Sequence, residues 1–469
     1  MTALRIKPII WVVPILALVA QSCLVAKNYE RPDDELPTEN LYRTDAQPED
    51  TTSFASLSWR EVFTDTTLVN LIEKGLENNL DIRIAIEQMT AAQAYLKQGK
   101  AGYFPTLDAT AQWTHQEFSN NSQFGQVFNG SLDQYELSAA ASWELDVWGR
   151  IRSTKRAAEA SYLQSLEAHK AVKTRLIATI ATSYYQLLAL DEQLQVTRET
   201  VENREKGLET TKALKDAGNV TEVGVQQTAA QLYASQSLLI DIGNQIRLQE
   251  NALSILLGEA PHTIERTDLD SQQIDTLFGE GVPAQLLANR PDVRAAEFGL
   301  MNAFELTNVA RANFFPTFQI TATGGYQSLA LETWITPQSI FFNLIGSLTQ
   351  PIFNQRRIRT NYEVSQAAQR EALLRFEQSL LTAGREVSDA LGTYEATKQK
   401  VEIKTKEFEA YDLALQYSEE LLNNGLANYL EVLNARENTL ASELTLIDLR
   451  FMELRTRVQL YTALGGGWQ

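Results

Sequence analysis

Few side chains in this sequence have the type and spacing that catalysis or metal binding needs. The three histidines, His115, His169 and His262, are scattered and lack the spacing of metal ligands. The sequence contains no Gly-x-Ser-x-Gly nucleophile motif, no P-loop and no dinucleotide-binding fingerprint. It therefore gives no case for an enzyme, a catalytic residue, a metal site or a cofactor.

The single cysteine, Cys23, carries the most specific chemical signal in the chain. It follows a short basic start and an apolar run over 9–20, which has signal-peptide length and is too short for a comfortable membrane span. The Ala-Gln-Ser that precedes Cys23 resembles a bacterial lipoprotein signal, in which cleavage leaves a lipidated cysteine. We expect residues 1–22 to be removed and Cys23 to carry a covalent lipid. An ordinary secretory signal with an incidental cysteine is the alternative.

The bulk composition limits the classes of partner. The chain has 469 residues and a net charge of −18, which argues against nucleic acid because phosphate binding needs clustered Lys and Arg. One cysteine cannot form an internal disulfide or a cysteine metal cage. Beyond the leader, no window holds 18 uninterrupted apolar residues, so any membrane crossing after export would use strands.

Two segments of the first half alternate apolar and polar side chains with a period of two, over 106–114 and 135–147. A loop rich in Asn, Ser, Gly and Gln separates them, which predicts an amphipathic β-hairpin. Strands that cross a bilayer need about 9–11 residues, and these are long enough. The second half repeats the pattern over 318–327 and, less regularly, over 340–353.

Long helices are predicted after each hairpin. Residues 153–216 contain no proline, and apolar residues recur every seven positions beside charged neighbours, which is a coiled-coil seam whose second position is often polar. A turn at 216–219 leads into a return helix over about 221–257. The seam residues are Ile180, Leu187, Leu194, Val201 and Leu208.

The whole order of elements occurs twice. Phe104-Pro105 and Phe315-Pro316 lie 211 residues apart, whereas Gly218 and Gly425 lie 207 residues apart. The first hairpin is therefore longer by four residues, and each repeat reads helix, β-hairpin, long helix, turn and return helix.

Four strands cannot close a barrel, because about eight is the smallest number that does. An open sheet in lipid leaves unpaired backbone groups, so chains would have to pool their strands, and three chains would supply twelve. Taken singly, the strands would also suit a soluble sandwich and the heptads a plain coiled coil. The duplication in one register, on an exported chain, favours the membrane interpretation.

The motifs as a set resemble the TolC-like outer membrane efflux proteins, of the lipid-anchored kind that serves resistance–nodulation–division pumps. The match covers essentially the whole chain in order. It is carried by Asn28-Tyr29-Glu30-Arg31-Pro32, Trp59, Phe63-Thr64-Asp65, Asn78-Asn79-Leu80-Asp81, Phe104-Pro105, the stretch from Ser142 to Arg150, Asn289-Arg290-Pro291-Asp292-Val293, Phe314-Phe315-Pro316, Gln350-Pro351-Ile352-Phe353 and the stretch from Gly425 to Ala435.

The resemblance implies an α+β membrane protein. It would be a homotrimer whose 12-stranded β-barrel, with four strands per chain, continues into a long α-helical barrel. The implied division of the chain is a signal peptide (1–22), a lipid-anchored arm and collar (23–65), a first repeat (66–258), a linker in the equatorial region (259–283), a second repeat (284–465) and a C-terminal tail (466–469).

The resemblance also implies a gate at the two helical turns, Gly218 and Gly425, which would coil inward in the trimer. Glu431 and Asn434 are three residues apart and share a helix face, so Glu431 would form an acidic ring that favours cations. In relatives an acidic residue often stands in place of Asn434, so the usual double ring is in question here. Glu222 and the two turns are expected to dock a periplasmic adaptor protein.

The resemblance finally implies a passive exit duct in the outer membrane of a Gram-negative bacterium. Its partners would be the periplasmic adaptor, an inner-membrane efflux transporter and outer membrane lipid. Two alternatives stay open, the exit duct of a protein secretion system and a lipid-anchored periplasmic coiled-coil scaffold or adaptor. The sequence does not indicate the substrate.

Overall fold

The computed structural model describes residues 25–32, 36, 41, 57–123, 125–126, 131–272, 289–427 and 429–469. Cys23, the leader 1–22, most of the predicted arm and part of the linker 259–283 lie outside the described residues, so the predictions for them stay predictions. The main elements are α2 (Trp59–Val62), α3 (Thr66–Asn78), α4 (Leu80–Ala101), β1 (Thr106–Glu117), β2 (Ser131–Leu145), α5 (Arg150–Asp216), α6 (Glu222–Leu256), α8 (Pro291–Ala312), β3 (Thr317–Ser328), β4 (Ile340–Thr349), α9 (Arg357–Asn423) and α10 (Tyr429–Ala463).

The bounds of these elements repeat in the register expected from the sequence. α4 and α8, like β1 and β3, begin 211 residues apart, whereas α5 and α9, like α6 and α10, begin 207 residues apart. The four-strand sheet and the internal repeat are thus confirmed. The fourth strand differs from the expected 340–353, because it ends at Thr349 just before Pro351. Proline has no N–H for the ladder, which explains the earlier end.

The chain divides into two compact units, and each takes segments from both repeats. We call them the sheet unit and the hairpin unit. The sheet unit comprises Met1–Pro32, Met89–Ser165 and Ala296–Phe376, and the hairpin unit comprises Asp33–Gln88, Leu166–Ala295 and Glu377–Gln469.

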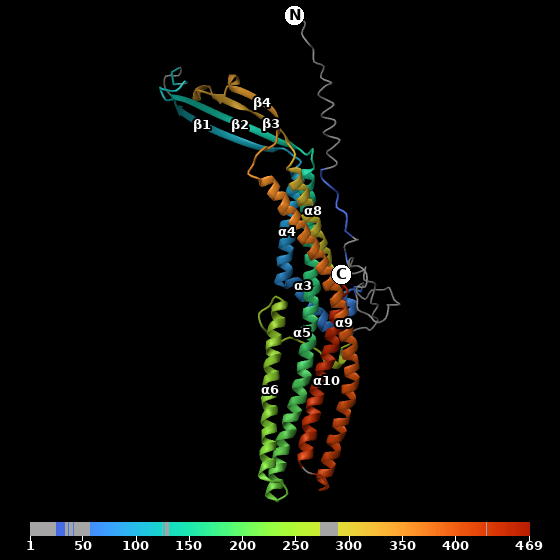
Figure 1. Ribbon diagram of the computed structural model, residues 1–469. Coiled ribbons are helices and arrows are strands. Elements are labelled where there is room, and N and C mark those ends of the chain that lie inside the picture. Colours follow the sequence, from blue (N-terminus) through green and yellow to red (C-terminus); the bar gives the residue numbers. More distant parts are fainter. Residues whose placement is uncertain are drawn as a thin grey trace. The chain divides into compact units, whose positions relative to one another are not determined.

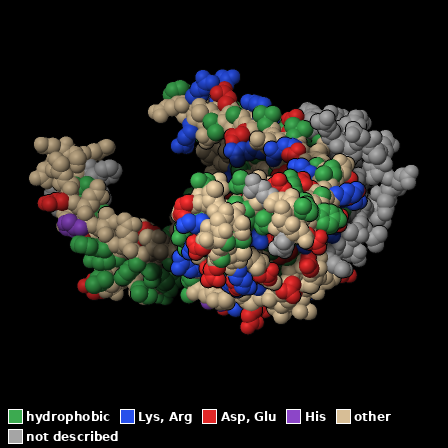
Figure 2. Space-filling view, turned by 90° about the horizontal axis from the view of Figure 1, so that it is seen from below, with side chains coloured by type: hydrophobic (Ala, Val, Ile, Leu, Met, Phe, Trp, Pro, Cys, Tyr) green, Lys and Arg blue, Asp and Glu red, His purple; other side chains and the backbone are tan. Residues whose placement is uncertain are grey.

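The sheet unit holds one antiparallel sheet in the order β1-β2-β3-β4 (Figure 1). The two repeats meet along β2 and β3, where Leu137 lies opposite Tyr326. Hydrophobic side chains are exposed on this sheet (Figure 2), among them Trp113 on β1 and Phe342 on β4. Monomeric soluble proteins rarely expose so many large apolar side chains on one surface, so we expect another apolar surface to cover this sheet.

The run from Ser142 to Arg150 forms the junction between β2 and α5. The carboxylate of Asp146 accepts hydrogen bonds from the amides of Ile151 and Arg152, which satisfies two unpaired N–H groups of the helix start. Trp148 stacks on Phe315 at 4.8 Å between ring centroids and donates its indole N–H to the carbonyl of Pro316 at 2.7 Å. The end of the first hairpin and the start of the second are thereby held together.

The chain just after the predicted lipid site is fixed on the same unit. Val25 is buried in a cluster with Trp148 and Ala312. The side chain of Asn308 donates to the carbonyl of Lys27 at 2.9 Å and accepts from its amide at 3.3 Å. Residues 25–32 therefore form a strap on α8, beginning two residues after Cys23.

The hairpin unit holds the α5–α6 and α9–α10 hairpins, whose turns lie at the same end (Figure 1). The predicted seam of α5 is buried at Ile180, Leu187, Val201 and Leu208, but Leu194 is only half-buried. On α9 only Val387 of the matching positions is fully buried. No described helix has both the length and the apolar character needed to cross a membrane.

A polar network around Asp65 connects the start of α3 with α5 and with the segment that follows α6 in this unit. The Asp65 carboxylate accepts hydrogen bonds from the hydroxyls of Tyr184 and Thr267 at 2.7 and 2.6 Å, and from the side chain of Gln272 at 2.8 Å. Burial alone would raise the pKa of Asp65, but these bonds outweigh it and the pKa lies below its usual value. Burial raises the pKa of Tyr184 to about 12, so it stays a hydrogen-bond donor at neutral pH.

Candidate functional site at the hairpin tips

The two predicted tip residues, Gly218 and Gly425, have the same backbone conformation. Their φ angles are +82° and +70°, in the left-handed region that glycine adopts without a Cβ penalty. At the first tip the amide of Gly218 donates to the carbonyl of Lys215 and the amide of Asn219 to that of Leu214; the second tip repeats this pair of bonds. Both tips are therefore Schellman caps, which end a helix and turn the chain sharply.

The first tip is closed by an exposed ion pair. Lys215, in the last turn of α5, lies 2.8 Å from the carboxylate of Glu222, the first residue of α6, and Gln226 donates to the same carboxylate at 2.7 Å. The hydrogen bond from Lys215 lowers the pKa of Glu222, and the same bond raises the pKa of Lys215. Glu222 is therefore ionised and accessible at neutral pH.

The second tip differs at the matching position, because Tyr429 stands 207 residues after Glu222. Tyr429 is buried, and its hydroxyl lies 3.2 Å from Oγ1 of Thr228 on α6. One repeat thus uses this position for an exposed ion pair within its own hairpin. The other uses it for a buried hydrogen bond between the two hairpins.

Arg204 makes a second connection between the hairpins. Its side chain is 5% exposed, and its guanidinium donates to the carbonyl of Gln231 on α6 and to the carboxylate of Glu437 on α10, both at 2.8 Å. A buried arginine needs such partners, since an unpaired buried charge is costly. We call Arg204, Glu437, Thr228 and Tyr429 together the brace.

Glu431 and Asn434 lie where the sequence places them, on the first turns of α10. Both side chains are exposed, whereas Val432 and Leu433 between them are buried. Their common face therefore points away from the packed side of α10. Within the described part of the chain, no basic side chain lies within ion-pairing distance of Glu431.

Sequence reasoning did not find the brace, although one signal pointed to part of it. Arg204 stands three residues after the seam residue Val201, at the second seam position that is often polar in this chain. A charged residue in a buried seam needs a partner. Its partner on α10 could not be named, because contacts between the two hairpins are not encoded by local spacing.

The comparison with protein families decides the identity of this architecture. The family model described as "Outer membrane efflux protein" matches residues 71–259 and 282–466, which is most of the chain and both repeats. The chain belongs to the outer membrane efflux protein family.

Individual relatives agree with this family. The cation efflux system protein CusC of Escherichia coli O6:H1 is 28% identical over 457 residues, covering 97% of this chain and 98% of CusC. The toluene efflux pump outer membrane protein TtgI of Pseudomonas putida is 30% identical over 411 residues, covering 87% of each chain. Among solved structures, CusC aligns with a TM-score of 0.84 at 27% identity over 94% of this chain and 100% of CusC. The outer-membrane channel OprN aligns with a TM-score of 0.87 at 25% identity over 95% of this chain and 100% of OprN.

The chain is therefore an outer membrane efflux protein with the α+β fold of these channels, and its relatives are channel proteins and not enzymes. The described residues contain no group of three or more His, Cys, Asp or Glu side chains that could hold a metal.

Proposed function

We propose that this outer membrane efflux protein is the passive exit duct of a tripartite efflux pump, opened at its tips by a periplasmic adaptor and an inner-membrane transporter. The family match over both repeats carries this proposal. The names of CusC and TtgI, a cation efflux protein and a toluene pump component, support a role in efflux without fixing the cargo.

The proposal includes a homotrimer with a 12-stranded barrel. In the described sheet, β1 and β4 each have one edge without a partner strand. Each unpaired backbone group would cost several kcal/mol in lipid, and four strands are too few to close on themselves. Three copies joined edge to edge would remove every open edge and cover the exposed apolar side chains with lipid.

The proposal also includes a lipid on Cys23 that anchors the chain in the outer membrane. The strap supports it, because residues 25–32 are fixed on α8 beside the junction of the strands and the long helices. Val25, two residues after Cys23 in the sequence, is held beside the ends of the strands. That is where a membrane anchor belongs.

The gate in this proposal is the ring of Glu431 side chains at the tips. Glu431 and Asn434 share the exposed face of α10, and an acidic ring in a narrow pore favours cations. Asn434 adds no charge, so the ring would carry one carboxylate per chain. The brace would hold each pair of hairpins in the closed arrangement, and Glu222 would meet the adaptor.

Single-channel recording in a planar lipid bilayer tests the duct and its gate together. We expect small, cation-preferring steps from the wild type and larger, less selective steps from Glu431→Ala. Asp448→Ala is the matched control, because it removes an exposed carboxylate from the same helix farther from the tip. Conductance steps unchanged by Glu431→Ala would show that the gate is formed by other residues. Well-folded protein that gives no conductance would favour the alternative of a periplasmic scaffold.

A further inference from the structure

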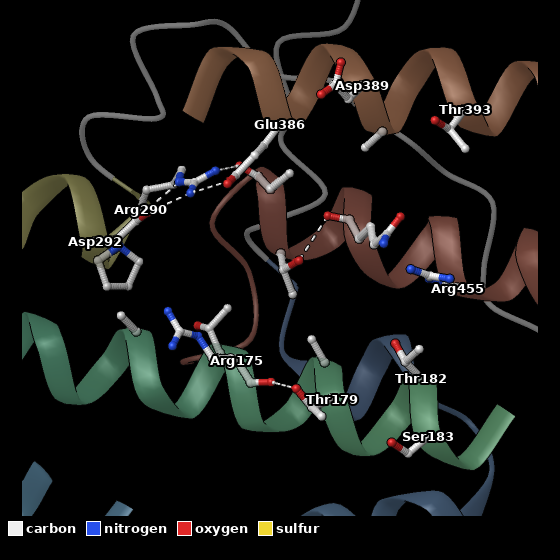
Figure 3. Close-up of a pocket in the computed structure, with 18 residues that line it drawn as sticks. Arg175, Thr179, Thr182, Ser183, Arg290, Asp292, Glu386, Asp389, Thr393 and Arg455 are labelled. Carbon is white, nitrogen blue, oxygen red and sulfur yellow. Dashed lines mark hydrogen bonds and ion pairs between the residues drawn. The ribbon is translucent and has the colours of Figure 1, made fainter. Parts of the chain in front are cut away.

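The hairpin unit contains a cavity at the end of the unit that lies away from the tip turns. Its volume is about 640 Å³, and it is lined by α5, the start of α8, α9 and the end of α10 (Figure 3). Small-molecule sites commonly have volumes of about 300–1,000 Å³. The cavity is therefore large enough for a small organic molecule.

Most charges in the cavity wall are already paired. Arg290 donates to the carboxylate of Asp292 at 2.6 Å and to the carbonyl of Ala463 at 3.0 Å, and it lies 2.7 Å from the carboxylate of Glu386 (Figure 3). Asp389, on the α9 wall, lies 3.9 Å from Arg385 on its own helix. The acidic side chains that line the cavity are thus all beside an arginine.

Two arginines of the wall, Arg175 on α5 and Arg455 on α10, have no such partner. In the part of the chain that the structure describes, no carboxylate lies within ion-pairing distance of either guanidinium, and the guanidinium of Arg455 lies 4.0 Å from the sulfur of Met452. Arginine presents five N–H donors in a planar fork that suits carboxylate and phosphate groups. Arg175 is exposed and Arg455 is half-buried, so both forks are available to an anion that enters the cavity.

Hydroxyl groups in the same wall can donate further hydrogen bonds to an anion. Thr182 and Ser183 line the cavity from the α5 side, as Arg175 does (Figure 3). Thr174, also in the wall, has a buried hydroxyl with no hydrogen-bond partner within the described residues. This oxygen has almost no accessible surface, so the hydroxyls that a ligand in the cavity could use are those of Thr182 and Ser183.

We propose that this cavity binds a small organic anion, a molecule with carboxylate, phosphate or sulfonate groups, held by Arg175 and Arg455. The two forks would bind its anionic groups, and the hydroxyls of α5 would take further oxygens. The cluster of Arg290, Asp292 and Glu386 carries one excess negative charge and repels an anion, so the ligand would lie on the side of Arg175 and Arg455. This inference goes beyond the duct and the tip gate and does not depend on either.

Isothermal titration calorimetry with citrate tests the proposal, because citrate is a compact tricarboxylate that fits the volume. The full-length protein is titrated in an uncharged detergent at low ionic strength. Each charge-assisted hydrogen bond that is lost should weaken binding about tenfold or more, so Arg175→Gln and Arg455→Gln should each raise the Kd by at least that factor. The double variant should give no heat of binding.

Arg198→Gln is the matched control, since it makes the same change at an exposed position of α5 outside the cavity. It should bind citrate like the wild type, and all variants should retain the wild-type circular dichroism spectrum and elution volume. Binding should weaken at about 1 M salt, where the Debye length falls to about 3 Å. Wild type that gives no heat with citrate, or a double variant that binds as well as the wild type, would overturn the assignment.

Discussion

Replacement of Arg204 by methionine is the sharpest test of how the tips are held. Methionine keeps most of the buried volume of the arginine stem and removes both inter-helix hydrogen bonds. The bond to Gln231 joins α5 to α6, and the bond to Glu437 joins α5 to α10. Arg204→Met should therefore free the second hairpin from the first near the tip while the helices themselves persist.

The magnitude follows from the exposure of the two partners. Hydrogen bonds to charged groups contribute about 1.5–3 kcal/mol, and the lower end applies here because the Glu437 side chain is 55% exposed. Burial of the apolar methionine offsets part of this loss. A net cost of about 1.4 kcal/mol corresponds to a tenfold change in the ratio of closed to open tips.

Two assays measure this change. Hydrogen exchange should become about tenfold faster for amides of α6 and α10 near the tips, because exchange of such amides follows local opening. In planar bilayers, large openings should become about tenfold more frequent. Arg198→Met, an exposed arginine of the same helix, should change neither quantity.

A double-mutant cycle gives the refuting result. If Arg204 acts through Glu437, Arg204→Met combined with Glu437→Gln should open the tips little more than Arg204→Met alone. Additive effects of the two changes would show that the ion pair does not connect the hairpins. Unchanged exchange in Arg204→Met would refute the brace as a whole.

Three further outcomes follow from the tip region. Tyr429→Phe removes the bond to Thr228 and should destabilise the inter-hairpin packing by about 1 kcal/mol, visible as a lower denaturation midpoint; an unchanged midpoint would mean that the contact is incidental. Burial, together with neighbouring carboxylates, raises the pKa of Glu443 in the folded protein. The folded protein therefore loses stability as pH rises from the ordinary carboxyl pKa through this raised pKa, and the loss persists at higher pH. Glu443→Gln should therefore raise the Tm at pH 8 and lose this gain as pH falls toward the ordinary carboxyl pKa, whereas an equal gain at every pH would contradict the ionisation argument. Glu222→Lys should weaken cross-linking to the adaptor, and cross-linking at the wild-type level would count against a docking role for this residue.

The repeat could be derived from the sequence because its signals are local. Period-two alternation, heptad spacing and the positive-φ glycines Gly218 and Gly425 each depend on neighbours within a few residues. The offsets of 211 and 207 residues then recur in the element bounds. The end of β4 was misplaced because alternation continues weakly toward Pro351, where the missing N–H and not the side-chain pattern decides.

The contacts between elements could not be derived in the same way. Arg204 could be recognised as a buried seam residue, but its bond to Glu437 crosses 233 residues of sequence. The cavity could not be predicted for the same reason, since Arg175 and Arg455 line it together only after α5 and α10 have packed. Spacing along one helix predicts which face a residue shares, and it leaves open which helix that face meets.

The seam of α5 changes in character along its length. Its first positions near the middle of the helix, Ile180 and Leu187, are fully buried, whereas Val201 and Leu208 nearer the tip keep 8% and 9% of their surface exposed. The second positions toward the tip are buried but polar, as at Thr197, Arg204 and Thr211.

Polar residues in a seam fix register at a cost in stability, because a purely apolar seam would gain more from burial. The tip half of the first hairpin therefore combines an apolar cluster of Val201, Leu208, Val225 and Leu232 with the directional bonds of Arg204 to α6 and α10. In the proposed gate, loss of the Arg204 bonds should therefore change the ratio of closed to open tips about tenfold, while the apolar cluster keeps the hairpin folded.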